Sequence, residues 1–524
     1  MKERVRFTRA AGVVGSATLL SRIFGFLRDM MIAWVFGAGA GADAFFVAFR
    51  IPNLLRRLLA EGSLSVSFIP VFTEYLANQG QEEAFRLARS AVKMLSILLL
   101  VVVVLGIIFS PAIVRIIAPG FAGSTDKLSL TISLTRIMFP YIFFIALMAL
   151  GMGILNTLGH FAAPAAAPAL LSITMIASIY LISPHFADPI TGLAIGVLFG
   201  GALQLSLQIP FILKKGIYTE KKTAFYHTGL KKIGQLMVPT IFGAAVYQVN
   251  ILVGTLLASL LPEGSVSFLY YADRLVQFPL GIFAIAIATA VLPSLSRQAA
   301  AGDIDGLKDT FSHAMKLVSF ITLPSMAGLI ILREPIIAVL FKRGAFDARS
   351  TQLTAEALLY YSIGLWAFSA VRVVVSTFYA LQDTRTPVRT AFIAVIANIL
   401  FGVILMRFLN HGGLALATSL SSMLNLALLM WSLRVKLGSL KWREMGPSIM
   451  KSSFCSIIMG AVLWTSSVVF FSKKVSPGSG LLLGLIGTMT LGIMSYVILS
   501  YLLKNPELSH LFSMAQKSLK KGEC

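Results

Sequence analysis

A series of long apolar stretches is the feature that most constrains what this chain can fold into. A helix needs about 20 apolar residues to cross a bilayer, and inside lipid every backbone N–H and C=O must find its partner within the protein. Only 13% of the 524 residues are charged and the mean hydropathy is +0.84. We therefore predict an all-α integral membrane protein with 14 transmembrane helices, at 11–37, 42–75, 94–118, 130–157, 162–184, 190–213, 233–260, 266–296, 317–340, 354–380, 387–407, 412–433, 449–471 and 479–503.

The basic residues indicate how these helices are oriented. When residues near the ends of the spans are counted with the connections, 27 of the 44 Lys and Arg residues lie on the side of the two termini, 9 lie on the opposite side and 8 lie well inside the predicted spans. Because cytoplasmic connections carry the excess of Lys and Arg, we expect both termini to be cytoplasmic. The net charge of +22 has the same explanation. No basic run is interleaved with aromatic residues, so nucleic acid is not an expected partner.

Matching segments recur along the chain at a nearly constant offset, which indicates an internal repeat. Residues 68–93 align with 291–316, residues 110–121 with 334–345, and residues 158–164 with 381–387. The matched pairs are 223 or 224 residues apart: Pro70 and Pro293, Lys93 and Lys316, Pro111 and Pro335, Gly120 and Gly344, Pro164 and Pro387. Transporters are often built from such repeats, with the substrate path between them.

The repeat predicts the organisation of the chain. Each repeat holds six helices, so both have the same orientation and a parallel relationship across the membrane. We expect an N-lobe of helices 1–6 at 1–214, a basic cytoplasmic linker at 215–232 and a C-lobe of helices 7–12 at 233–435. Residues 436–524 then hold helices 13 and 14 and a cytoplasmic tail.

Charged residues inside the predicted spans are concentrated in the first lobe. A charge at mid-bilayer costs roughly 2.5–3.5 kcal/mol on insertion scales, so such residues usually face a cavity and carry function. Arg22 and Asp29 are seven residues apart and share a helix face. The residues of interest are Arg22, Arg28, Asp29, Asp43, Arg50, Arg56, Arg57 and Glu61, with the polar Asn53, in the first lobe, and Asp273 and Arg274 in the second.

Helical spacing suggests a division of roles within the segment FRIPNLLRRLLAEGSLS. Asn53 reaches Arg56 and Arg57 at i+3 and i+4, while Arg57 and Glu61 are spaced for an ion pair. We therefore expect Arg57 and Glu61 to be structural, and Arg56 and Asn53 to face a cavity. Snorkelling to a headgroup is the alternative for single arginines, namely Arg50, Arg136 and Arg372.

Several arginines in one cavity call for a polyanionic substrate. A guanidinium binds phosphate through a bidentate fork and stays charged at any relevant pH, so a diphosphate fits. Residues 386–433 contain no Asp or Glu, which argues against a proton-carrying carboxylate there. The uncharged helices 13 and 14 are predicted either to wall a groove for a lipid tail or to serve as scaffold or oligomer interface.

Enzyme and metal signatures are missing from the sequence. The two cysteines, Cys455 and Cys524, form no disulfide framework, and the six histidines have no metal-ligand spacing. There is no Walker A, GxSxG or HExxH motif. A membrane glycosyltransferase would also bind a polyprenyl diphosphate, but it needs a catalytic carboxylate beside a large soluble loop. We expect no catalytic residue, no metal and no cofactor.

Several blocks of sequence carry a resemblance to a known family. They are SRIFGFLRD (21–29), GADAFFVAFRIPNLLRRLLAEGSLSVSFIPVFTEY (41–75), APGF (118–121), GSVSFLYYADRLVQFPLGIF (264–283) and LPSLS (292–296). The chain resembles, over essentially its whole length, the MurJ/MviN family of lipid II flippases. That family belongs to the MOP exporter superfamily together with the MATE drug exporters.

The resemblance implies a function and a set of site residues. Such proteins move lipid II, an undecaprenyl-diphosphate carrying a disaccharide-pentapeptide, from the cytoplasmic to the outer leaflet of the bacterial inner membrane for cell-wall synthesis. It also implies a lipid-tail groove at helices 13 and 14. The substrate-binding residues are expected to be Arg22, Arg28, Asn53, Arg56, Ser267 and Arg274, and the gate or structural ion-pair residues Asp29, Asp43, Arg57, Glu61 and Asp273.

Two departures and two alternatives accompany the resemblance. The first departure is Gln277, which stands where some relatives carry Glu. The second is the absence of Asp and Glu from helices 11 and 12, which weakens the case for a carboxylate-bearing sodium site. Coupling of transport to the membrane potential is compatible with both. The alternatives are a flippase for another polyprenyl-diphosphate-linked saccharide and a MATE-like exporter. Expected partners are lipid II, membrane lipids and cell-wall synthesis proteins.

Overall fold

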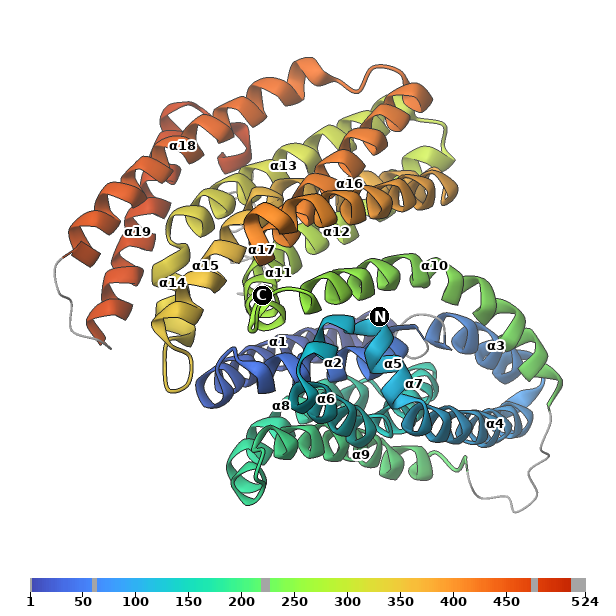
Figure 1. Ribbon diagram of the computed structural model, residues 1–524. Helices are drawn as coiled ribbons and strands as arrows, with labels where there is room; N and C mark the ends of the chain where they lie inside the picture. The colour runs from blue at the N-terminus through green and yellow to red at the C-terminus, as the bar shows by residue number, and fades with distance from the viewer. Residues whose placement is uncertain (1, 59–63, 218–226, 473–478, 510–524) are drawn as a thin grey trace. The chain divides into compact units, whose positions relative to one another are not determined.

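A computed structural model describes residues 2–58, 64–217, 227–472 and 479–509, and that part of the chain is almost wholly helical and contains no β-strand (Figure 1). The predicted all-α membrane fold is therefore confirmed. The helices pack as two compact units. Unit 1 comprises residues 1–267 together with 343–346, and unit 2 comprises residues 268–342 and 347–524.

Unit 1 is a bundle in which α1 packs on α8, α8 on α9, and α2 on α6. Prolines interrupt the backbone ladder inside several of its helices, as they do in many membrane helices. Its elements are α1 (Lys2–Phe36), α2 (Ala40–Leu55), α3 (Ser65–Asn78), α4 (Gly80–Ile108), α5 (Ser110–Ile117), the 3₁₀ turn η2 (Pro119–Gly123), α6 (Thr125–Met138), α7 (Tyr141–Thr157), α8 (Ala162–Leu181), η3 (Ser183–His185), α9 (Ile190–Lys214) and α10 (Thr228–Ser259).

Unit 2 is built around α13, which packs against α16 and α18. The hairpin of α18 and α19 closes one side of this unit, where the Tyr496 hydroxyl donates a 2.7 Å hydrogen bond to the carbonyl of Phe320. The elements are α11 (Ser265–Pro279, whose first turn belongs to unit 1), the π turn η4 (Leu280–Ala284), α12 (Ile285–Ala300), α13 (Ile304–Ile331), α14 (Arg333–Phe341), α15 (Ala348–Ile363), α16 (Leu365–Ala380), α17 (Arg385–Leu437), α18 (Trp442–Ser472) and α19 (Ser479–Leu502).

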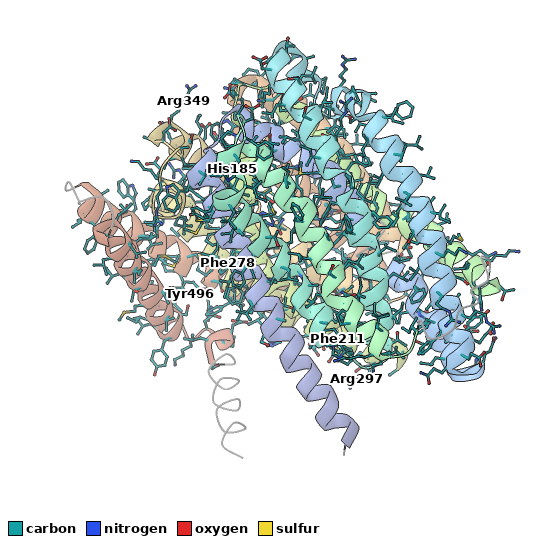
Figure 2. All side chains as sticks on the ribbon, turned by 90° about the horizontal axis from the view of Figure 1, so that it is seen from below. His185, Phe211, Phe278, Arg297, Arg349 and Tyr496 are labelled. Carbon is teal, nitrogen blue, oxygen red and sulfur yellow. The ribbon has the colours of Figure 1, made fainter. Side chains whose placement is uncertain are left out.

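Nine helices among the described residues are long and apolar enough to cross a membrane, and ten if the bent pair α15 and α16 is one span. Their exposed faces carry large apolar side chains such as Phe278, which is 61% exposed (Figure 2). Breaks shorten several predicted spans, whereas α17 runs through two of them with an interruption at Asn410, where φ is 46° and ψ is −129°. The count of 14 spans stays a prediction.

Two connections that the sequence analysis treated as loops are mostly helical. Residues 76–93 belong to the end of α3 and the first turns of α4, joined by a tight turn in which Gly80 has a φ of +88°. Residues 297–316 belong to α12 and α13, with the turn at Gly302, where φ is +70°. The charged residues of these amphipathic extensions hid their helical character from a search for uninterrupted apolar runs.

Backbone geometry repeats at the offset found in the sequence. Gly159 and Gln382, which are 223 residues apart, both end a helix in the left-handed region with φ of +76° and +57°. At both sites the next N–H closes a wide turn, from His160 to Leu155 at 2.8 Å and from Asp383 to Phe378 at 2.9 Å. Each repeat thus ends the same helix with the same Schellman-type cap, which supports the internal repeat.

The compact units and the predicted lobes divide the chain at different places. Helix α10, the first span of the predicted C-lobe, packs within unit 1 against α3, α4, α5 and η2. Part of the predicted linker, residues 218–226, lies outside the described residues. The lobe boundaries therefore stay a prediction about the repeat.

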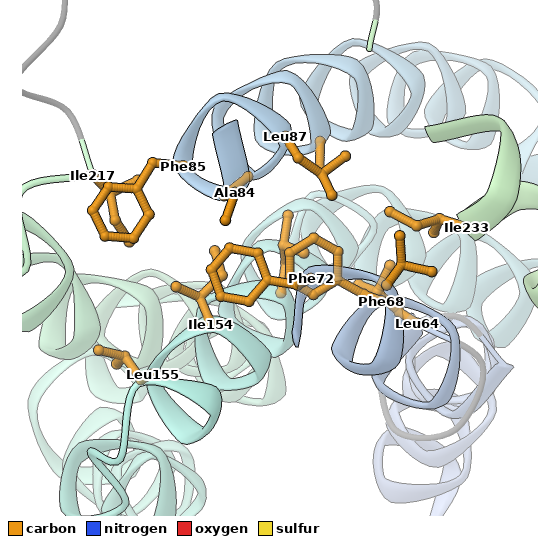
Figure 3. Packing of buried hydrophobic residues seen from close by; sticks show 14 of the residues in the cluster. Leu64, Phe68, Phe72, Ala84, Phe85, Leu87, Ile154, Leu155, Ile217 and Ile233 are labelled. Carbon is orange, nitrogen blue, oxygen red and sulfur yellow. The ribbon is translucent and has the colours of Figure 1, made fainter. Parts of the chain in front are cut away.

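A buried apolar cluster joins the ends of α3, α4 and α7 in unit 1 (Figure 3). Phe68 and Phe72 of α3 stack at a centroid distance of 5.3 Å, and Phe72 is fully buried. Leu87 of α4 and Ile233 of α10 pack against the same cluster. These contacts fix the end of α10 against the α3–α4 hairpin, and truncating a buried Phe typically costs about 3–5 kcal/mol.

Candidate functional site

Arg28 and Asp29 of α1 form a buried ion pair. The Nη2 and Nε atoms of Arg28 donate to Oδ1 of Asp29 at 2.7 and 3.0 Å, and the two side chains are 10% and 3% exposed. A charge that is removed from water needs such a partner. Arg22, six residues earlier on the same helix, is exposed. The predicted Arg28 site therefore carries its own counter-charge, whereas Arg22 projects from the helix surface.

The spacing of α2 brings Asn53 and Arg56 together as expected. The Nε of Arg56 donates to the side-chain oxygen of Asn53 at 2.9 Å, and both residues are half-buried. Asn53 thereby orients the guanidinium plane one turn further along the helix. Arg57 is also half-buried, but its predicted partner Glu61 lies outside the described residues, so that ion pair stays a prediction.

The carboxylate of Asp43 accepts four hydrogen bonds from groups on α6 and around the start of α11. It is in the first turn of α2, and its side chain is 2% exposed. Oδ2 accepts from the backbone N–H of Gly264 at 2.8 Å and from Nζ of Lys127 at 2.7 Å. Oδ1 accepts from the backbone N–H and the hydroxyl of Ser267 at 3.0 and 2.7 Å. Asp43 thus caps the first turn of α11, where the exposed amides and the helix dipole favour an anion.

Within unit 2, Arg274 of α11 is held by an aromatic neighbour. Its Nη2 donates to the hydroxyl of Tyr270 at 2.8 Å, and its guanidinium carbon is 4.7 Å from the centre of that ring. This i,i+4 pair combines a hydrogen bond with a cation–π contact. Asp273 is half-buried and accepts a long hydrogen bond, 3.5 Å, from Gln277.

Sequence reasoning missed Lys127, Glu263 and Tyr270. Tyr270 lies four residues before Arg274, so a search for aromatic partners at helical spacing would have found it. Lys127 was assigned to a loop, and nothing in the sequence relates it to Asp43, 84 residues earlier. Glu263 accepts a 2.6 Å hydrogen bond from the backbone N–H of Ala40. Glu263 and Ala40 are 223 residues apart, which is the offset of the repeat. Equivalent positions in two repeats need not touch, so the offset alone does not predict this contact.

The described residues contain no group of three His, Cys, Asp or Glu side chains that could hold a metal ion. Outside the membrane spans, a hydrogen bond from Lys436, followed by one from the backbone of Thr386, lowers the pKa of Asp383 to about 2. Asp383 and Lys436 lie at the ends of neighbouring helices and join them.

Long apolar helices that carry paired charges and arginines define the class of the protein, an α-helical multi-pass membrane protein. A solved structure described as lipid II flippase MurJ in an inward closed conformation superposes with a TM-score of 0.78 at 29% identity, covering 94% of this chain and 98% of that one. An inward-facing MATE multidrug transporter of the MOP superfamily has the same fold, with a TM-score of 0.67 at 17% identity and coverage of 82% and 99%.

The particular family follows from the sequence comparisons. The model of the family described as lipid II flippase MurJ matches residues 32–485. A probable lipid II flippase MurJ from Vibrio cholerae is 39% identical over 508 residues, which are 95% of this chain and 96% of the relative. The lipid II flippase MurJ of Burkholderia cenocepacia is 37% identical over 430 residues, covering 81% and 83%. The chain belongs to the MurJ family.

Proposed function

We propose that this protein flips lipid II from the cytoplasmic to the outer leaflet of the bacterial inner membrane by alternating access. Family membership over nearly the whole chain is the observation that carries the proposal. The protein acts as a transporter and not as an enzyme, and both termini lie in the cytoplasm. The proposed orientation rests on the distribution of Lys and Arg, 27 on the side of the termini against 9 on the other.

The proposed site binds the diphosphate of lipid II through guanidinium groups. Arg22 and Arg28 on α1, Arg56 at the C-terminal cap of α2 and Arg274 on α11 supply the positive charge. Arginine matches phosphate geometry through two parallel hydrogen bonds. A guanidinium has five N–H donors, and the contact of Arg28 with Asp29 engages its Nε and Nη2 atoms. Asn53 supports the site by orienting Arg56.

The remaining predicted residues have supporting roles in this proposal. Asp29 holds Arg28, and Asp273 lies beside Arg274 on α11. Ser267 is among the expected substrate-binding residues, but because its hydroxyl donates to Asp43 we assign it with Asp43 to a gate at the start of α11. Arg57 and Glu61 form a structural ion pair. The hairpin of α18 and α19 receives the isoprenoid tail, supported by its apolar exposed side chains, among them Trp464 and Leu483. Cell-wall synthesis proteins are the proposed protein partners.

Complementation with a direct transport assay tests the proposal. The host's own lipid II flippase is depleted, each variant is expressed, and outer-leaflet lipid II is measured alongside growth. Wild type should restore both, whereas Arg28→Ala and Arg274→Ala should fail at equal membrane levels. Arg28→Lys and Arg274→Lys should restore only part of the transport, because lysine keeps the positive charge but cannot form two parallel hydrogen bonds to a phosphate.

Arg349→Ala serves as the matched control, because Arg349 is an exposed arginine at the start of α15 (Figure 2) and is not one of the proposed site residues. It should behave as wild type. If well-inserted wild type moves no lipid II, a flippase for another lipid-linked saccharide replaces the proposal. If the alanine variants at Arg28 and Arg274 transport normally, the function stands and the arginine site is wrong.

A further inference from the structure

Helices α2 and α11 exchange N-terminal caps within unit 1. Asp43, in the first turn of α2, accepts hydrogen bonds from the backbone N–H groups of Gly264 and Ser267 at the start of α11. In return, Glu263, just before α11, accepts from the backbone N–H of Ala40 at the start of α2. Ala40 and Glu263 are separated by the repeat offset of 223 residues. The exchange is therefore a product of the repeat, in which each helix start is capped by an acidic residue near the start of its equivalent.

The two halves of this exchange are unequal. Asp43 is buried and carries an ion pair with Lys127, whose ammonium lies 2.7 Å from Oδ2 and 4.2 Å from the centre of the Phe121 ring. The Lys127 side chain is itself only 11% exposed. Glu263 is exposed, and the residue one repeat after Lys127 is the uncharged Ser350. A lysine therefore supports one half of the exchange and has no counterpart in the other.

Because the ion pair is buried, the charge of Lys127 is important for holding the Asp43 carboxylate in place. In a site closed to water, an ion pair is screened little and removal of one partner leaves an uncompensated charge. Without Lys127, Asp43 would keep two backbone N–H groups and one hydroxyl, and its negative charge would be matched only by the partial charge of the helix end. The carboxylate would then gain more from hydration, and the cap on α11 would be released more readily.

With the termini in the cytoplasm, as proposed, and α1 crossing the membrane once, the gate formed by Asp43 and Ser267 lies on the outer side. We propose that Lys127 is a positioning residue of this outer gate: it holds Asp43 on the first turn of α11 and so sets how readily that gate opens. The inference rests on the proposed function, since α11 carries Arg274 and a gate has meaning only in a transport cycle. Lys127 does not touch the substrate. It acts through Asp43, and its charge determines the balance between the capped and the released helix.

The rival explanation is a salt bridge that only stabilises the fold. Such a role would lower the melting temperature of Lys127 variants without changing the accessibility of the start of α11 in folded protein. The test therefore measures accessibility. Ser265, which is 3% exposed at the start of α11, is replaced by Cys in a protein whose Cys455 and Cys524 are changed to Ala. Labelling by a membrane-impermeant maleimide is timed in right-side-out membrane vesicles.

Lys127→Met should raise the labelling rate of that cysteine at least fivefold, and Lys127→Arg should remain within twofold of the reference. Lys342→Met removes one charge from an exposed lysine and should have no effect. Asp43→Asn should also raise labelling, and adding Lys127→Met to it should raise the rate no further, because Lys127 acts through that carboxylate. Melting temperature and gel filtration confirm folding, and Lys127→Gln replaces Lys127→Met if the latter does not fold.

Unchanged labelling in folded Lys127→Met protein would overturn the proposal, as would an equal rise in Lys342→Met or additive effects of Asp43→Asn and Lys127→Met. Because labelling requires no lipid II, its failure is separate from a failure of the proposed transport. If the cysteine is labelled as expected but the protein moves no lipid II, the proposed gate stands and the assignment of lipid II as the substrate is wrong.

Discussion

The carboxylate of Asp43 accepts two hydrogen bonds from Ser267, one from the backbone N–H at 3.0 Å and one from the hydroxyl at 2.7 Å, across 224 residues of sequence. Both residues are almost fully buried. The start of α11 is thus fixed to the first turn of α2 by a contact whose strength depends on one ionised side chain.

Ser267→Ala tests the strength of this contact. The substitution removes the hydroxyl donor and keeps the backbone N–H, so the free energy of unfolding should fall by about 1.5–3 kcal/mol, the usual value of a hydrogen bond to a charged group. Ser265→Ala is the control, since that hydroxyl donates to the neutral carbonyl of Pro262 and should cost about 1 kcal/mol. Denaturant unfolding in detergent, followed by tryptophan fluorescence, measures both. Equal losses would contradict the special role of the Asp43 charge.

Tyr270→Phe tests whether the aromatic partner positions Arg274. The ring remains, but the hydroxyl that accepts from Nη2 is lost, so the guanidinium becomes less well oriented. We expect lipid II transport to fall about three- to tenfold, because a factor of ten corresponds to about 1.4 kcal/mol. Tyr379→Phe, at a half-exposed position on α16, should leave transport unchanged. Normal transport by Tyr270→Phe would show that Arg274 needs no such support.

The fold was largely predictable because apolar length is a strong signal in membrane proteins. Most predicted spans fall on helical segments, although breaks divide several of them and α17 runs through two. The repeat offset recurs in the backbone caps at Gly159 and Gln382. What failed was the identification of loops. The extensions at 76–93 and 297–316 are helical, since amphipathic turns outside the bilayer satisfy helix geometry without forming an uninterrupted apolar run.

The candidate site was predictable only where spacing along one helix decides contact. The pairing of Asn53 with Arg56 follows from i,i+3 geometry, and Arg28 with Asp29 are neighbours in sequence. Contacts between residues far apart in the sequence leave no comparable spacing pattern in the sequence. Lys127 meets Asp43 because α6 packs on α2, and that packing is set by the whole of unit 1.

Gly120 and Gly344, matched in the sequence repeat, both lie against the end of a helix. A Cβ on Gly120 would be 2.0 Å from the carbonyl oxygen of Ser259 at the end of α10, and one on Gly344 would be 2.4 Å from that of Trp34 on α1. All four residues belong to unit 1. Because these neighbours are backbone atoms, no side-chain rotation relieves the overlap.

Gly120→Ala should therefore lower the free energy of unfolding by about 2 kcal/mol or more, in the range of overpacked sites. The control is Gly234→Ala inside α10, where a Cβ meets nothing within 4 Å. There the substitution should stabilise the protein by about 0.5–1 kcal/mol, because Gly is unfavourable in a helix interior. Thermal unfolding in detergent separates the two, and a neutral Gly120→Ala would mean that η2 and α10 separate easily.

The ion pair of Asp383 with Lys436 predicts a pH dependence of stability. Hydrogen bonds from Lys436 and then from Thr386 lower the pKa of Asp383 from 3.8 to about 2. The unfolded chain therefore binds more protons than the folded one between these values, so the stabilisation is present above pH 4 and is lost as the pH falls toward 2. The shift corresponds to at most about 2.4 kcal/mol. Because Lys436 is 41% exposed, screening should reduce the effect to about 1 kcal/mol.

Asp383→Asn should remove this contribution, so the variant should melt below wild type at pH 7 and approach it as the pH falls toward 2. Asp188→Asn is the control, since Asp188 is exposed and its side chain makes no hydrogen bond to the described residues. It should follow wild type at every pH. Melting temperatures in detergent from pH 2 to 7 measure the difference. If the gap in melting temperature between wild type and Asp383→Asn does not change with pH, the contact stabilises α16 and α17 through packing and not through the charge of Asp383.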